Sequence, residues 1–126
     1  MPRKISKKGL KKKLDTAWSK VVRLQAGNKC EVCSKTEYLN AHHIVGKRNL
    51  RLRWELYNGV SLCSGCHTLK TDSAHQNPVW FEKWLKEDRG EDYKLIEATM
   101  NEIKKWTVDE MLVKLKELEE LYSEEN

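Results

Sequence analysis

Four cysteines, arranged as two Cys-x2-Cys pairs, are residues whose type and spacing indicate chemistry. The pairs are Cys30/Cys33 and Cys63/Cys66, with 29 residues between them. Four thiolates at about 2.3 Å from Zn²⁺ complete a tetrahedral shell. Because a closed shell leaves no position for water or substrate, we expect this zinc to be structural. Four buried or free thiols are the alternative.

A second set of polar residues lies between and beside the cysteine pairs. His42 and His43 are adjacent, so on a strand their side chains point to opposite faces and would do different work. Asn58 follows them, and His67 comes directly after the second cysteine pair. One histidine could bind a metal while the other acts as a base. Since a lone histidine is usually structural, these residues have to be weighed as a set.

The order of these residues resembles the zinc-stabilised, four-cysteine branch of the HNH endonucleases, in particular the small stand-alone members encoded by bacteriophages. The resemblance covers about residues 18–72, with 15 residues from His43 to Asn58 and nine from Asn58 to His67. It implies an α+β fold with a zinc-stabilised, treble-clef-like ββα-metal core, in which a two-stranded hairpin and one helix hold a divalent cation. An N-terminal helix and C-terminal α-helices would flank this core.

Carried over residue by residue, the resemblance implies that His42 and His67 bind the catalytic metal and that His43 is the general base. Asn58 would hold the loop between the strands so that His43 keeps its orientation. Some relatives add a histidine one helical turn after the last motif histidine, where this chain has Thr71, so the third protein ligand stays open. Two imidazoles and several open positions suit Mg²⁺, Mn²⁺, Ni²⁺ or Zn²⁺ about equally.

These residue types fit the hydrolysis of a phosphodiester. A neutral imidazole, whose ordinary pKa is about 6.5, can take a proton from water near neutral pH. A cation opposite it would stabilise the departing 3′ oxygen, so we expect a metal-dependent DNA endonuclease that leaves a 5′ phosphate. Four basic side chains are candidates for contacts with nucleic acid, although each could be an ordinary solvated charge: Arg48, Arg51, Arg53 and Lys70.

Two aromatic residues near the motif receive structural assignments. Trp54 could stack on nucleic acid, but we expect it in the core or at a hinge. His75 could approach the site, but it stands just before Asn77-Pro78, and we expect it to have an ordinary structural role.

The elements that position these residues follow from periodicity and turn signals. In the motif region we predict a helix over 14–25 ended by Gly27-Asn28, a strand over 39–45, a turn at Asn58-Gly59, a strand over 60–62 and a short helix from 67 to 71. Beyond it we predict a helix from Pro78 to Gly90, a second over about 92–106, and a third opened by a capping box at 107–110. We expect these last helices to cover the core or to pair with one another; a dimer seam along the third stays open.

Length and charge bound the organisation of the chain. Its 126 residues are one domain's worth, and no apolar run approaches the roughly 18 residues that cross a bilayer. We expect a basic, disordered tail over 1–13, a nuclease core with structural zinc over 14–75, and a helical extension of the same domain over 76–126. Without an apolar signal core, the cysteines predict a reducing cytoplasm, that of the host bacterium for a phage-encoded protein.

The charge distribution predicts the partners. Residues 1–29 carry a net charge of +9, residues 30–75 carry +2 and residues 76–126 carry −6, which favours DNA near the N-terminal half. The resemblance implies a possible DNA-packaging terminase partner, for which the acidic helices would be a docking surface. A non-catalytic zinc-knuckle DNA-binding module and a protein-interaction adaptor are the alternatives. No motif fixes the target sequence, the oligomeric state, or the choice between nicking and double-strand cleavage.

Overall fold

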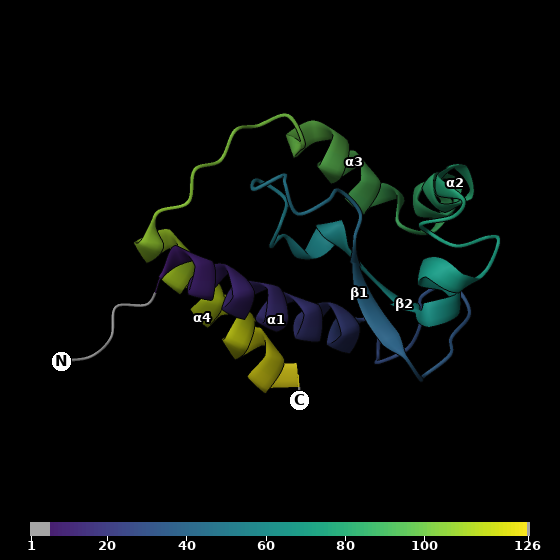
Figure 1. The fold of residues 1–126 in the computed structure, drawn as a ribbon, viewed down its shortest axis with the longest axis horizontal. Coiled ribbons are helices and arrows are strands. Elements are labelled where there is room, and N and C mark those ends of the chain that lie inside the picture. The colour runs from purple at the N-terminus through teal and green to yellow at the C-terminus, as the bar shows by residue number, and fades with distance from the viewer. Residues whose placement is uncertain (1–5, 126) are drawn as a thin grey trace.

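A computed structural model describes residues 6–125 and has the predicted α+β fold class. A small two-stranded sheet and its connecting loop lie between helices that come from both ends of the chain (Figure 1). Residues 1–5 of the predicted basic tail lie outside the described residues. The elements are α1 (Lys7–Gln25), β1 (Leu39–His43), the 3-10 helix η1 (Leu56–Asn58), β2 (Gly59–Cys63), the short π-helix η2 (Gly65–Leu69), α2 (Pro78–Asp88), α3 (Gly90–Thr99) and α4 (Val108–Glu125).

Helix α1 begins at Lys7, so the prediction of a disordered tail is wrong for residues 7–13. The side chain of Ser6 caps the helix by accepting a hydrogen bond from the backbone N–H of Gly9 at 3.0 Å. Leu10 and Leu14 lie four residues apart on one face and are fully buried in a cluster shared with α4. This packing stabilises the first turns of the helix despite the repulsion among their lysines. The predicted end is confirmed, with Gly27 and Asn28 at positive φ.

Strands β1 and β2 pair antiparallel, with Leu39 opposite Cys63 and His43 opposite Gly59. The predicted turn at Asn58-Gly59 is wrong: Asn58 ends η1, and Gly59 is the extended first residue of β2, at φ −121°. Glycine is required there for space, because an added Cβ would lie 2.5 Å from Val22 Cγ2 and 2.7 Å from a ring carbon of Trp18. Helix α1 therefore presses directly on the sheet.

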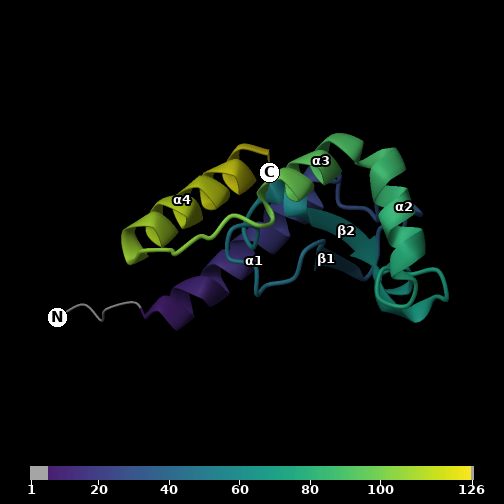
Figure 2. The same ribbon diagram turned by 90° about the horizontal axis from the view of Figure 1, so that it is seen from above.

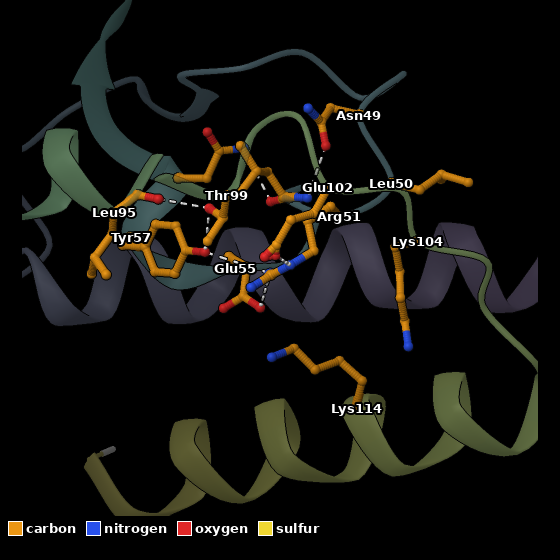
Figure 3. Close-up of polar contacts among 12 residues, drawn as sticks. Asn49, Leu50, Arg51, Glu55, Tyr57, Leu95, Thr99, Glu102, Lys104 and Lys114 are labelled. Atoms are coloured by element: carbon orange, nitrogen blue, oxygen red, sulfur yellow. Dashed lines mark hydrogen bonds and ion pairs between the residues drawn. The ribbon is translucent and has the colours of Figure 1, made fainter. Parts of the chain in front are cut away.

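The C-terminal helices differ from prediction at one boundary. Helix α3 ends at Thr99, so the prediction that it continues to 106 is wrong, and residues 101–107 form a non-helical strap. Figure 3 shows this strap beside the loop between the strands. The Asn49 side chain donates a hydrogen bond to the Met100 carbonyl at 2.8 Å, and the Trp106 indole N–H donates to the Leu50 carbonyl at 2.9 Å. These contacts with a distant segment replace helical hydrogen bonds.

Helix α4 begins with the predicted capping box. Glu110 accepts a hydrogen bond from the Thr107 backbone N–H at 3.0 Å, and the Thr107 hydroxyl accepts one from the Glu110 N–H at 3.1 Å. The helix then runs beside α1 in the same direction (Figures 1 and 2). Met111 and Leu118 are buried against α1, whereas Val108 and Leu112 on the same helix stay exposed. No helix that the structure describes is long and apolar enough to span a membrane.

Candidate metal centres and catalytic site

The four cysteines gather into one cluster. Their sulfur atoms all lie within 4.8 Å of one another, and the Cys33 and Cys63 sulfurs are 3.6 Å apart. Two sulfurs that share a tetrahedral Zn²⁺ at about 2.3 Å are separated by about 3.8 Å. Cys30, Cys63 and Cys66 are buried, and Cys33 is exposed. The cluster therefore has the donor set and spacing of a structural zinc site.

The protonation of these thiols also fits a cation. Burial raises the pKa of Cys63, but hydrogen bonds, first from the backbone N–H of Cys66 and then from neighbouring thiols, outweigh burial and lower this pKa to about 7. Burial raises the pKa of Cys66, and its hydrogen bond with Cys63 raises it further. The two pKa values move in opposite directions, so without a cation Cys63 and Cys66 would not ionise together. A bound Zn²⁺ would supply the charge that allows all four to ionise.

Three histidines form a second cluster. His42 lies on β1, His67 on η2 and His75 in the following loop, and one ring nitrogen of each lies within 4.8 Å of the others. The Nε2 atoms of His67 and His75 are 3.0 Å apart. Two nitrogens that share one cation at about 2.1 Å lie roughly 3.0 to 3.4 Å apart, for octahedral and tetrahedral angles respectively. The three imidazoles could therefore hold a metal ion.

His75 approaches this site, which is the alternative that the sequence interpretation ranked below an ordinary structural role. Its backbone N–H donates to the His67 carbonyl at 3.1 Å, and the Ala74 N–H donates to the Cys66 carbonyl at 2.8 Å. These bonds fold the chain back after η2 and bring residue 75 beside residue 67. The sequence held one signal for this role. Relatives can carry a further histidine at the position of Thr71, and His75 is the next histidine along the chain.

The environment of His42 keeps its ring neutral. Its ring meets that of Phe81 on α2 edge-on, with centroids 5.2 Å apart. Burial, followed by the charges of His67, His75 and His43, lowers the pKa of His42 to about 3. A neutral imidazole is the form that binds metals. Burial and the charge of His75 lower the pKa of His67 in the same direction.

His43 lies against α1 rather than in the cluster of three. Its ring stacks on the indole of Trp18, with centroids 3.8 Å apart and 13° between the planes. Its Nε2 atom is 2.9 Å from the carbonyl oxygen of Arg53. Burial lowers the pKa of His43, an effect that the Arg53 carbonyl and the carboxylate of Asp15 partly offset. A half-buried ring with fixed neighbours and a mainly neutral state can accept a proton near neutral pH.

Asn58 is fully buried beneath the loop that joins the strands. Its Oδ1 accepts the backbone N–H of Val45 at 2.8 Å, while its Nδ2 donates to the carbonyls of Val45 at 3.0 Å and Leu52 at 3.1 Å. One side chain therefore ties both ends of the loop together just after His43. Trp54 is also fully buried, as expected for a core position.

The four candidate contacts with nucleic acid fall into two classes. Arg53 is held by Asp15, at 3.0 and 2.8 Å, and Arg51 lies among Glu55, Tyr57 and Glu102 (Figure 3). Both guanidinium groups are thus engaged within the chain, which sequence reasoning could not anticipate. The other two candidates, Arg48 and Lys70, are exposed. Lys70 Nζ lies 3.9 Å from the sulfur of Cys66 in the four-cysteine cluster.

Comparison with known proteins identifies this region. Residues 30–73 match the family model of the HNH endonucleases. Comparison with curated proteins and with solved structures gave no match. The matched segment contains both cysteine pairs, both strands and the first three histidines. The chain therefore carries an HNH endonuclease domain at residues 30–73, built on a ββα-metal core whose four clustered cysteines suit zinc.

Proposed function

We propose that the protein is a metal-dependent endonuclease that hydrolyses DNA phosphodiester bonds with water activated by His43. The observation that carries this proposal is the placement of two adjacent residues. His42 joins a cluster of three imidazoles, while His43, the next residue, is tied separately to the Arg53 carbonyl. Metal binding and proton transfer can thus take place side by side without competing for one ring.

The contact with Arg53 determines which nitrogen of His43 can act. A carbonyl oxygen only accepts hydrogen bonds, so the Nε2 atom, 2.9 Å away, must carry the proton. The lone pair of the neutral ring is then on Nδ1. Nδ1 would take the proton of the attacking water, an effect worth about 10²- to 10⁴-fold in rate. The stacked indole of Trp18 limits rotation of the ring, so Nδ1 keeps its direction.

His42, His67 and His75 would hold the divalent cation. When bound, it would supply charge that stabilises the departing 3′ oxygen, which leaves a 5′ phosphate on the product. The donor set narrows the choice of metal, since the described cluster has three imidazoles and no carboxylate. Imidazole ligands suit Ni²⁺ and Zn²⁺, whereas Mg²⁺ and Mn²⁺ prefer oxygen ligands and would rely more on water and phosphate.

DNA as the substrate is supported by cations near His43. Arg48 is exposed on the loop that follows β1, and in that loop Lys47 lies 3.7 Å from Asp15 of α1. Lys11 and Lys8 precede Asp15 by four and seven residues, so they share its helix face. A positive path would therefore lead from the first turns of α1 to the catalytic loop. The bacterial cytoplasm and a terminase partner for the acidic helices stay predictions from the resemblance.

A plasmid-nicking assay tests this function. The zinc-loaded protein is incubated with supercoiled DNA and Mg²⁺, Mn²⁺, Ni²⁺ or Zn²⁺ in turn, beside a His43→Ala variant. We expect wild-type cleavage with at least one cation, and a loss of about 10²-fold or more in the variant with zinc content and DNA affinity unchanged. DNA binding without cleavage under any cation would instead support the zinc-knuckle binding module. Absence of both binding and cleavage would support the adaptor.

A further inference from the structure

Helix α1 lies outside the segment that matches the nuclease family, yet it supplies side chains to the surroundings of His43. Asp15 and Trp18 are three residues apart, so they share one face of the helix, and this face meets the loop between the strands. The proposed mechanism assigns no role to Asp15.

Asp15 holds two consecutive loop residues. Its carboxylate accepts two hydrogen bonds from the guanidinium of Arg53, at 3.0 and 2.8 Å, and a third from the indole N–H of Trp54 at 2.9 Å. Burial raises the pKa of Asp15, but the hydrogen bonds from Arg53 and Trp54 outweigh it, so the pKa lies below its ordinary value. The carboxylate is thus charged and almost fully engaged by the loop.

Trp18 holds the next residue of the same loop. Its indole N–H donates to the carbonyl of Glu55 at 2.9 Å, while its ring face stacks on His43. Three consecutive loop residues, 53 to 55, are therefore fixed to α1. The carbonyl of the first of these, Arg53, is the group that contacts Nε2 of His43.

We propose that Asp15 and Trp18 are positioning residues for the catalytic base, acting through the Arg53 carbonyl. The inference rests on the proposed role of His43. The two residues aim this carbonyl at Nε2, keep the proton there and leave Nδ1 free for water. Neither residue touches the substrate. The nuclease motif would thus depend for its rate on a helix that precedes it in the chain.

Asp15→Asn is the first test, because it removes the charge and weakens the double contact with Arg53 while keeping the size of the side chain. The matched control is Asp92→Asn on α3, which makes the same chemical change. Asp92 also forms a half-buried ion pair with an arginine, with its Oδ2 2.5 Å from Nε of Arg89. We expect kcat for DNA nicking to fall at least about 10-fold in Asp15→Asn, since small displacements of catalytic groups cost 10- to 100-fold. KM for DNA, zinc content and the cation dependence should stay within twofold of the control.

The second readout is independent of cleavage. The ¹⁵N shifts of the His43 ring, recorded on zinc-loaded protein without further cation, report which nitrogen carries the proton. Wild type should show the Nε2–H form, and Asp15→Asn should show a mixture of forms. Trp18→Phe, which keeps an aromatic ring but loses the N–H bond to Glu55, should act in the same direction and covers the case in which Asp15→Asn fails to fold.

The outcomes separate this inference from the proposed function. Wild-type protein that never cleaves DNA would contradict the proposed function, and the tautomer measurement would still decide the positioning role. If Asp15→Asn lowers kcat no further than Asp92→Asn, or if His43 keeps a single Nε2–H form in the variants, the positioning role is wrong.

Discussion

Replacing His75 by alanine tests its proposed role as the third protein ligand of the cation. In the structure its Nε2 lies 3.0 Å from Nε2 of His67, the separation of two neighbouring ligands of one cation. Losing even a hydrogen-bond partner of a metal ligand costs about 10- to 100-fold in affinity, so loss of a ligand itself should cost at least about 100-fold. That corresponds to about 2.8 kcal/mol. The four cysteines form a separate cluster, so the variant should keep its zinc.

Calorimetric titration of the zinc-loaded protein with Ni²⁺ or Mn²⁺ measures this loss, and the cation concentration at half-maximal nicking measures it again. Gln76→Ala is the matched control, because Gln76 ties the same loop to the Thr68 carbonyl, at 2.5 Å, without offering a ring nitrogen. We expect His75→Ala to require about 100-fold more cation and Gln76→Ala to change little. Equal midpoints for His75→Ala and wild type would refute the assignment of His75 as a ligand.

Four further predictions concern zinc, packing, charge and pH. Cys30→Ser should lose the tightly bound zinc, worth on the order of 10 kcal/mol, and with it the fold; elemental analysis and circular dichroism check this, and full zinc content would contradict it. Gly59→Ala should cost about 1 to 3 kcal/mol in urea unfolding because its Cβ overlaps α1; unchanged stability would show that α1 yields easily. Replacing Lys8 and Lys11 by glutamine should reduce the slope of log DNA affinity against log salt by about 1.8, since each of two phosphate contacts contributes about 0.9. The control replaces Lys12 and Lys13, which line the groove beside α4. An unchanged slope would show that this face of α1 does not contact DNA. Folding lowers the pKa of His42 from 6.5 to about 3, so between these two pH values the unfolded chain binds a proton that the folded chain does not. The free energy of unfolding should therefore fall as the pH is lowered from 6.5 towards 3, and it should fall less steeply in His42→Gln. Identical pH profiles of stability for the two proteins would exclude this contribution.

The sequence was sufficient for the parts of the site that depend on local spacing. The two cysteine pairs, the strand pair around His42 and His43, and the capping box of α4 are encoded within a few residues each. Periodicity also located the end of α1 at Gly27 and Asn28. Such local signals are carried by residue type and turn preference, which do not require knowledge of the rest of the chain.

The parts that were missed depend on contacts between distant segments. Leu10 extends α1 because α4, about a hundred residues later, covers it. The helix predicted up to Trp106 is interrupted because Asn49 donates a hydrogen bond to the Met100 carbonyl and Trp106 donates one to the Leu50 carbonyl. His75 joins the histidine cluster through backbone bonds to the end of η2. Arg53 seemed free for DNA because the sequence could not show its carboxylate partner on α1.

The tight approach of α1 to Gly59 has a consequence for how related chains can diverge. A side chain at position 59 is admissible only if the residues at 18 and 22 both make room or the helix moves away, since a ring carbon of Trp18 and Val22 Cγ2 would otherwise stand 2.7 and 2.5 Å from the new Cβ. Positions 18, 22 and 59 should therefore change together among chains that keep this helix. In a relative with a larger residue at 59 and an unchanged valine at 22, we expect that the N-terminal helix no longer packs against the sheet of the nuclease motif.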